Sequence, residues 1–247
     1  MHRFFVPGDC ISQDSIVIDG GLAHRLRSVL RLGAGDHVVV LDNTGWEYEV
    51  ELGAASSGRI GGRITGRSLS TAEPRTRITL YQALLKGSSF EVVLQKCTEI
   101  GVRAFVPVIC ERCVADPPAE GRTTRWQTII LEAAQQSRRG RLPELHPAIA
   151  FHDACRSSKG VALLPWEQEG AQAIRAALRA FVKRETPSDV SIFIGPEGGF
   201  STPEAELARS EGILPVSLGS RILRAETAGL VASSLVLYEF DDLGVGS

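Results

Sequence analysis

The sequence predicts an α/β protein in which a small β-rich domain precedes a larger domain built on a parallel sheet. Residues 1–70 contain short apolar runs separated by turn-forming residues. From residue 77 onward apolar strands alternate with amphipathic helices, an order typical of a parallel sheet covered by helices on both faces. Residues 69–76 are polar, contain a proline and show no periodicity, which indicates a linker. We therefore expect two domains, at residues 1–70 and 77–247.

The first domain is expected to consist of strands and one short helix. A turn-rich loop, Asp42-Asn43-Thr44-Gly45, lies between two apolar runs and predicts a hairpin. The helix is expected over residues 22–30. The strands are expected at residues 3–6, 15–18, 37–41, 46–52 and 59–64.

The second domain shows strand and helix signals in turn. Its strands are expected at residues 78–85, 104–110, 161–164, 191–194 and 213–218. Capping boxes, in which Ser or Thr precedes Glu or Gln by three positions, predict helices that begin at Ser88, Thr124 and Ser201. Gly101 is placed to end the first of these helices. Apolar residues at helical spacing predict two further helices, at residues 174–182 and 225–240.

Composition and charge exclude several classes of protein. The formal net charge of −2 argues against a protein that coats nucleic acid, but it is compatible with a local basic patch. No apolar run reaches the length of a membrane span or a signal peptide, so we expect a cytosolic protein without a membrane partner. Cys110 and Cys113 form a C-x-x-C pair, but no second pair follows, so we expect reduced thiols and no metal.

Two loops carry the strongest chemical signal. Gly195-Pro196-Glu197-Gly198-Gly199 follows a buried strand and leads into a helix, so its backbone N–H groups can approach a ligand closely. Residues 218–227 likewise join the last strand to the last helix. Arg224 is unusual there, because a cation at a helix N-terminus is unfavourable unless an anion compensates it. An ion pair of Arg224 with Glu226 or Glu197 is the structural alternative to a functional role.

Ligands of open α/β sheets bind at the carboxyl ends of the strands, so these two loops are expected to converge on one pocket. The strand end at residues 163–167 is expected to complete it. The pattern is not that of a dinucleotide-binding protein, because G-x-G-x-x-G is absent, and neither a P-loop nor G-x-S-x-G occurs. The histidines show no metal-ligand spacing.

Several motifs along the chain resemble those of a known family. They are residues 194–200 and 218–228, together with Arg3-Phe4-Phe5, His24, residues 29–32, Gly35-Asp36, Lys86-Gly87 and residues 95–102. These motifs are similar to those of the RsmE family, the 16S rRNA uracil-N3 methyltransferases of the SPOUT superfamily. The resemblance implies an N-terminal PUA-like β-barrel and a C-terminal methyltransferase domain with a trefoil knot. It also implies S-adenosylmethionine as cofactor, 16S rRNA of the small subunit as partner, and a homodimer.

The resemblance also implies roles for individual residues. Arg224 is the expected electrostatic catalyst, and Glu226 the expected proton acceptor or the group that orients Arg224. Residues expected to bind the cofactor are Leu164, Ile194, Gly195, Pro196, Glu197, Gly198, Gly199, Leu218, Gly219, Ile222, Leu223 and Thr227. From the residues themselves, the arginines expected to contact RNA phosphates are Arg3, Arg25, Arg27, Arg31, Arg138, Arg139 and Arg141. The run Arg138-Arg139-Gly140-Arg141 is the strongest candidate, and solvated surface charge is the alternative for any single arginine. The alternatives are a ribose 2′-O-methyltransferase of the same superfamily and a non-catalytic RNA-binding assembly factor.

The chain departs from the family pattern at two places. Gln135 and Arg138 stand where family members usually carry glutamate and glycine. Cys110 and Cys113 stand where serines usually flank Glu111-Arg112.

Overall fold

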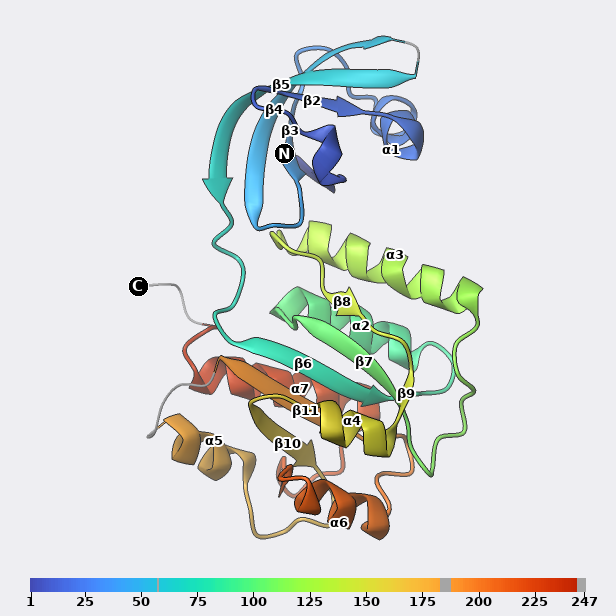
Figure 1. Ribbon diagram of the computed structural model, residues 1–247, viewed down its shortest axis with the longest axis vertical. Helices are drawn as coiled ribbons and strands as arrows, with labels where there is room; N and C mark the ends of the chain where they lie inside the picture. The colour runs from blue at the N-terminus through green and yellow to red at the C-terminus, as the bar shows by residue number, and fades with distance from the viewer. Residues whose placement is uncertain (57, 183–187, 244–247) are drawn as a thin grey trace. The chain divides into compact units, whose positions relative to one another are not determined.

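A computed structural model describes residues 1–56, 58–182 and 188–243 of the chain (Figure 1). The chain divides into two compact units. The first comprises Met1–Glu73 and Ala134–Leu142, and the second comprises Pro74–Ala133 and Pro143–Ser247. The return of the chain to the first unit at Ala134–Leu142 has no counterpart in the boundaries expected from the sequence. Residues 183–187 and 244–247, which those boundaries assign to the second domain, lie outside the described residues.

The first unit contains one sheet with the strand order β1-β3-β4-β5-β2. β3 and β4 pair antiparallel, which confirms the predicted hairpin, whereas β1 pairs parallel with β3. The helical segment begins two residues earlier than predicted, and its second half has π-helical hydrogen bonding. The elements are β1 (His2–Phe5), η1 (Gly8–Cys10), β2 (Ser15–Ile18), α1 (Gly20–His24), η2 (Arg25–Val29), β3 (His37–Leu41), β4 (Trp46–Ser56) and β5 (Arg59–Leu69).

Alternation along these strands produces the apolar core of the first unit. Val38 and Val40 on β3, and Val50 and Leu52 on β4, point to one side, as the period of two in a strand requires. Leu26 of η2 is fully buried against the same side chains. This core therefore lies between the sheet and the helical segment of the first unit.

The second unit contains a sheet with the strand order β12-β10-β11-β6-β7-β8, in which β9 also pairs with β7. All of these pairs are parallel, which confirms the predicted parallel sheet. Its strands are β6 (Arg77–Ala83), β7 (Ala104–Ile109), β8 (Glu144–Leu145), β9 (Ile149–Ala150), β10 (Val161–Pro165), β11 (Asp189–Ile194) and β12 (Leu214–Val216). The helices are α2 (Ser89–Ile100), α3 (Glu120–Gln136), α4 (Phe151–Ser157), α5 (Ile174–Val182), α6 (Thr202–Ser210) and α7 (Ala225–Glu239).

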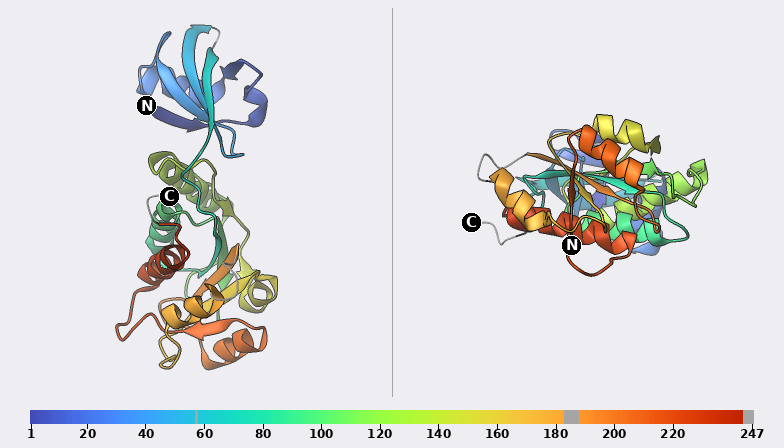
Figure 2. Two further views of the ribbon diagram at one scale, coloured as in Figure 1. Left: turned by 90° about the vertical axis from the view of Figure 1, so that its left-hand side faces the viewer. Right: turned by 90° about the horizontal axis from the view of Figure 1, so that it is seen from below.

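Helices cover both faces of this sheet, as predicted. On β6, Ile78 and Leu80 face a core shared with α2, α3, α5 and α7, whereas Tyr81 and Ala83 face a core shared with α4 and α6. Figure 2 shows these helices on opposite sides of the sheet. Because both faces are apolar, a polar ligand of this unit has to bind at an edge or at the strand ends.

Some helix starts differ from the prediction. Ser88 is the N-cap of α2, but its side chain makes no capping bond, and Glu91 pairs with Arg125 of α3 instead. α3 begins at Glu120 rather than near Thr124, whose hydroxyl donates to the carbonyl of Glu120 inside the helix. β8, β9 and α4 were not predicted. β8 and β9 are two residues long, so they leave no periodic signal. Across the described residues, no helix is both long and apolar enough to cross a membrane.

Candidate active site

A pocket of about 650 Å³ lies at the carboxyl ends of β10, β11 and β12 in the second unit. Three segments form most of its wall: residues 165–167 at the end of β10, residues 194–200 at the end of β11, and residues between 217 and 228 that follow β12. Ser89 at the start of α2 completes the lining. The two loops singled out in the sequence therefore converge on one cavity, where parallel sheets usually bind ligands.

The first loop, residues 195–199, depends on glycine for its backbone path. Gly199 has a φ of +67°, in the left-handed region that favours glycine, and its N–H donates to the carbonyl of Pro196 at 2.9 Å. A Cβ on Gly195 would lie 3.2 Å from the carbonyl carbon of Gly199 and from the nitrogen of Phe200. The loop is therefore a tight turn that brings backbone atoms to the pocket wall.

A complete capping box fixes the helix that follows this loop. The N–H of Ser201 donates to the Glu204 carboxylate at 2.9 Å, and the N–H of Glu204 donates to the Ser201 hydroxyl at 3.4 Å. This arrangement confirms the predicted start of α6, with Pro203 in its first turn. The positive end of α6 consequently adjoins the glycine loop.

Two hydrogen bonds tie the glycine loop to neighbouring strand ends. The carboxylate of Glu197 accepts the backbone N–H of Lys86, just after β6, at 2.9 Å. The guanidinium of Arg112, just after β7, donates to the carbonyl of Gly198 at 2.8 Å. The Arg112 bond is charge-assisted and hence stronger than an ordinary amide hydrogen bond. The loop is thus fixed from two sides rather than free to adapt.

The second loop ends at the N-cap of α7, which is Arg224. Its carbonyl accepts the N–H groups of Thr227 and Ala228 at 2.9 and 2.8 Å, so its backbone serves the helix while its exposed side chain stays available to the pocket. Within the described part of the chain, Arg224 forms no ion pair, because Glu197 is bound to Lys86 and Glu226 has no cationic partner within 4.0 Å. The geometry gives no support to the ion-pair alternative.

Most residues expected to hold a ligand lie on the pocket wall, and two do not. Leu164 is fully buried in the core between the sheet and α4 and α6, so the expectation for Leu164 is corrected. Thr227 is exposed and does not line the pocket, because Ala225, Glu226 and Ala228 occupy the side of α7 that faces it. The expected residues on the wall are Ile194, Gly195, Pro196, Glu197, Gly198, Gly199, Leu218, Gly219, Ile222, Leu223, Arg224 and Glu226.

The strand end at residues 163–167 was expected to complete the pocket, and its Pro165, Trp166 and Glu167 line the wall. Leu164 does not, because the strand ends one residue later than its apolar run suggests. The Trp166 indole N–H donates to the carbonyl of Phe200 at 3.3 Å, which joins the ends of β10 and β11. Sequence reasoning missed Ser89, although its place after β6 is a signal, since β6 neighbours β11.

Comparison with known proteins identifies the family. The family model described as RNA methyltransferase domain matches residues 72–237. A ribosomal RNA small subunit methyltransferase E from Synechocystis sp. is 34% identical over 238 residues, which cover 94% of this chain and 75% of that protein. The chain belongs to this RNA methyltransferase family.

Two further relatives of this RNA methyltransferase extend the match over nearly the whole chain. A protein of the same name from Bacillus subtilis is 29% identical over 97% of each chain. The crystal structure of such an enzyme from Neisseria gonorrhoeae, bound to S-adenosyl methionine, superposes with a TM-score of 0.84 at 29% identity, over 96% of this chain and 97% of that one. The resemblance to the RsmE family inferred from the sequence motifs is confirmed.

The arginines expected to contact RNA in this methyltransferase fall into two groups. Arg139 is only 2% exposed and forms an ion pair with Glu73, and Arg3 is 13% exposed and donates two hydrogen bonds to Glu47. Neither guanidinium is available to a phosphate, so both expectations are corrected. Arg25, Arg27, Arg31 and Arg138 are exposed, Arg141 is half-buried, and none of the five has an ion pair within the part of the chain that is described.

Proposed function

We propose that the protein transfers a methyl group from S-adenosylmethionine to N3 of a uridine in the 16S ribosomal RNA of the small subunit. One observation carries this proposal. The two family loops converge on one pocket, and Arg224 on its wall forms no ion pair with any residue that the structure describes. The names of the relatives, ribosomal RNA small subunit methyltransferase E, support the substrate class, and the cofactor-bound relative supports the cofactor.

The pocket fits such a cofactor by its shape and its chemistry. Gly195 and Gly199 keep the loop tight, because a Cβ on Gly195 would press on the backbone of Gly199 and Phe200 and one on Gly199 would press on the Glu167 carboxylate. Ile194, Leu218 and Leu223 provide apolar surface suited to an adenine ring. Glu167 provides a carboxylate suited to a ribose diol or to an ammonium group. When bound, S-adenosylmethionine supplies an electrophilic methyl group on a positively charged sulfur.

We infer that Arg224 and Glu226 act on the uracil. N3 carries a proton at neutral pH, so the site has to remove that proton and stabilise the negative charge left on O2 and O4. Arg224 supplies the stabilising positive charge, since it lines the pocket and no carboxylate of the described ranges pairs with it. Glu226, in the first turn of α7, accepts the proton or orients Arg224. The fixed glycine loop contributes by holding the reactants in one geometry.

The experiment that tests the function identifies the methylated atom. The protein is incubated with labelled S-adenosylmethionine and small ribosomal subunits that lack their modifications, and the RNA is digested to nucleosides. Label in 3-methyluridine is the expected result. Label in a 2′-O-methylated ribose would overturn the base assignment. Absence of label, with folded protein and competent subunits, would favour the non-catalytic RNA-binding alternative.

A variant at Arg224 tests the mechanism. Removal of one donor to a developing anion typically lowers kcat by about 10²- to 10³-fold, so we expect a loss of this size in Arg224→Ala, with little change in affinity for the cofactor. Arg175→Ala is the matched control, because Arg175 is an exposed arginine of α5 outside the pocket lining. Undiminished methylation by a stable Arg224→Ala protein would overturn the assignment.

We further infer finer features of the architecture. The strand order of the second unit, in which β11 lies between β6 and β10, is compatible with the trefoil knot of the SPOUT superfamily. The five-strand order of the first unit supports a PUA-like β-barrel. The proposed domains are residues 1–70 and 77–247, with the segment Ala134–Leu142 returning to the first compact unit. We also infer that the protein works in the cytoplasm, because its proposed substrate is ribosomal.

A homodimer is part of the same proposal. Tyr238 on α7 is 72% exposed, and Leu235 on α7 and Val92 on α2 are also exposed, so α7 carries apolar side chains beyond those that its own unit covers. A second copy of the chain would cover them. Light scattering after size-exclusion chromatography tests this, and a monomeric mass at micromolar concentration would overturn it.

A further inference from the structure

The turn that follows β7 brings two cysteines together. The N–H of Cys113 donates to the carbonyl of Cys110 at 3.1 Å, and the N–H of Cys110 lies 3.3 Å from the Cys113 sulfur. The Cα atoms at the ends of such a four-residue turn are less than about 7 Å apart, and disulfides span about 4.4–6.8 Å between Cα atoms. The backbone therefore already holds the two residues at a separation that a disulfide can bridge.

The two thiols differ in reactivity. A hydrogen bond with the Cys110 thiol is the main cause that lowers the pKa of Cys113 to about 7. The same hydrogen bond, followed by burial, raises the pKa of Cys110. Cys113 is half-buried and Cys110 is buried. At neutral pH a substantial fraction of Cys113 is therefore the nucleophilic thiolate, with Cys110 in place as the resolving thiol.

This turn also holds the glycine loop of the pocket. Glu111 and Arg112 lie between the cysteines. The N–H of Glu111 donates to the Glu204 carboxylate at 2.8 Å, and the Glu111 carboxylate accepts the Ser201 hydroxyl at 2.6 Å. The Arg112 guanidinium donates to the carbonyl of Gly198. Both residues between the cysteines thus contact the segment from the glycine loop to the capping box of α6.

A second route leads from the Cys113 sulfur to the same loop. The sulfur lies 3.6 Å from the carbonyl of Leu84 and 3.7 Å from that of Val108. Two residues after Leu84, the N–H of Lys86 donates to Glu197. Formation of an S–S bond of about 2.05 Å requires the Cys113 sulfur to leave at least some of these contacts.

We propose that Cys110 and Cys113 form a reversible disulfide, and that the oxidised turn weakens cofactor binding by withdrawing Arg112 from Gly198. The effect on the cofactor rests on the proposed function of the pocket, whereas the disulfide does not. No cluster of three or more metal-binding side chains occurs among the residues described, so the pair has no further ligands around it that would complete a metal site.

The oxidation balances with a hydroperoxide as oxidant. The Cys113 thiolate attacks one peroxide oxygen, the O–O bond breaks, and the other oxygen leaves as hydroxide and takes up a proton to form water. Cys113 is then a sulfenic acid. The Cys110 sulfur loses its proton and attacks the sulfenic sulfur, and the expelled hydroxide takes up that proton. With hydrogen peroxide, two thiols and one peroxide yield one disulfide and two waters. A dithiol reductant reverses the change.

The experiment uses the full chain and two independent readouts. The reduced protein is treated with hydrogen peroxide, remaining thiols are blocked with N-ethylmaleimide, and the peptide that contains both cysteines is analysed by mass spectrometry. We expect this peptide to carry no N-ethylmaleimide and to be two hydrogen atoms lighter than the same peptide with both thiols reduced. Calorimetry should then show about tenfold weaker S-adenosylmethionine binding, a factor that corresponds to about 1.4 kcal/mol. Dithiothreitol should restore both the mass and the affinity.

Variants identify the residues responsible. Cys113→Ser should keep its affinity under peroxide, whereas Cys155→Ser, which removes a buried cysteine outside the turn, should respond as the unaltered protein does. Arg112→Ala should bind the cofactor weakly with or without peroxide. Failure of the disulfide to form would overturn the site, and a disulfide without loss of affinity would overturn its control of the pocket. If the reduced protein fails to bind the cofactor while the disulfide still forms, the proposed function fails and the redox site stands alone.

Discussion

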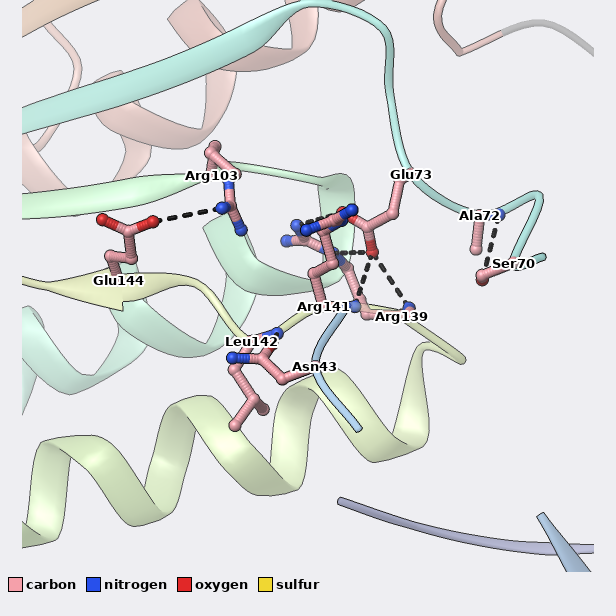
Figure 3. Close-up of polar contacts among 10 residues, drawn as sticks. Asn43, Ser70, Ala72, Glu73, Arg103, Arg139, Arg141, Leu142 and Glu144 are labelled. Carbon is pink, nitrogen blue, oxygen red and sulfur yellow. Dashed lines mark hydrogen bonds and ion pairs between the residues drawn. The ribbon is translucent and has the colours of Figure 1, made fainter. Parts of the chain in front are cut away.

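The guanidinium of Arg139 forms two hydrogen bonds with the carboxylate of Glu73, from Nε to Oε1 at 3.0 Å and from Nη2 to Oε2 at 2.8 Å (Figure 3). The same Oε1 accepts the backbone N–H groups of Gly140 and Arg141 at 3.0 and 3.1 Å. One carboxylate thus organises three consecutive residues that lie more than sixty positions further along the chain. Arg139 is only 2% exposed and Glu73 is 18% exposed, so the pair is hydrogen-bonded and largely shielded from solvent.

Removal of this carboxylate should destabilise the first unit. Glu73→Ala removes the carboxylate that pairs with the buried Arg139 cation, and breaking such a pair typically costs about 3–5 kcal/mol. Urea denaturation of the full chain, followed by hydrogen exchange in the first unit, measures the loss. Glu51→Ala is the control, because the Glu51–Arg63 pair is exposed and such pairs contribute about 0–1 kcal/mol. Equal stability of the two variants would show that the buried pair is not needed.

The same pair predicts a dependence of stability on pH. Burial alone would raise the pKa of Glu73, but the hydrogen bond and charge of Arg139 and the two backbone N–H groups outweigh it and lower the pKa below its ordinary value. A group with a lowered folded-state pKa stabilises the fold above its unfolded-state pKa, and this contribution is lost as the pH falls through the folded value. The unaltered protein should therefore lose stability on acidification below about pH 4.5, the ordinary value for glutamate.

Glu73→Gln isolates this effect, because it cannot titrate. Thermal denaturation between pH 3 and pH 7 should give a flatter profile for Glu73→Gln than for the unaltered chain in this acidic window. Parallel profiles would mean that other carboxylates account for the acid sensitivity.

The glycine loop predicts a second pair of matched variants. Gly199→Ala places a Cβ at a φ of +67° and within 2.9 Å of the Glu167 carboxylate, so we expect weaker binding of S-adenosylmethionine as well as strain of about 1 kcal/mol. Gly212→Ala introduces similar backbone strain at a φ of +81°, but its Cβ meets nothing within 4 Å and it lies outside the pocket lining. Calorimetry should show a loss of affinity in the first variant alone.

The exposed arginines predict how RNA binding responds to salt. Each phosphate contact that is lost should reduce the slope of log affinity against log salt by about 1, so Arg25→Glu with Arg27→Glu should reduce it by about 2. Arg63→Glu is the control, because Arg63 is exposed but already paired with Glu51. Filter binding to a 16S rRNA fragment at several salt concentrations gives the slopes. An unchanged slope in the double variant would remove Arg25 and Arg27 from the RNA-contact surface.

The thiol pair predicts a pH profile of alkylation. Since the thiolate is the reactive form and the pKa of Cys113 is about 7, its reaction with iodoacetamide should reach half of its maximal rate near pH 7. Cys110→Ala removes the hydrogen bond that lowers this pKa, so the midpoint should move upward, toward the ordinary value of 9.0. Peptide mass spectrometry after timed labelling follows Cys113 alone. An unshifted midpoint would show that Cys110 does not activate Cys113.

Local signals were sufficient to predict the pocket loops. Ser201 and Glu204 lie three positions apart, and Gly199 precedes them, so both the turn and the start of α6 follow from neighbouring residues. The convergence of the two loops followed from the rule for strand ends in parallel sheets. In contrast, Leu164 was misassigned because the apolar run of β10 ends before the strand does.

Long-range contacts could not be predicted in the same way. The burial of Arg139 depends on the carboxylate of Glu73, 66 positions away, and no periodicity in the sequence indicates such a partner. A run of three arginines around a glycine therefore suggested a phosphate-binding surface, although Arg139 in this run is buried and pairs with the half-buried Glu73. Similarly, Ser88 and Glu91 carry the spacing of a capping box, but Arg125 of a different helix offers Glu91 a stronger partner.

The interrupted path of the first unit has a consequence for its synthesis. The ribosome delivers Glu73 before the partner of its carboxylate, and 66 positions separate Glu73 from Arg139. At translation rates of about 5–20 residues per second, the nascent unit waits roughly 3–13 seconds for that cation. During this interval its sheet can form, but its acidic side chain stays hydrated and its last segment is missing. A chain that ends at the linker would lack Arg139 permanently. A version of the first unit that is produced on its own therefore has to include Ala134–Leu142.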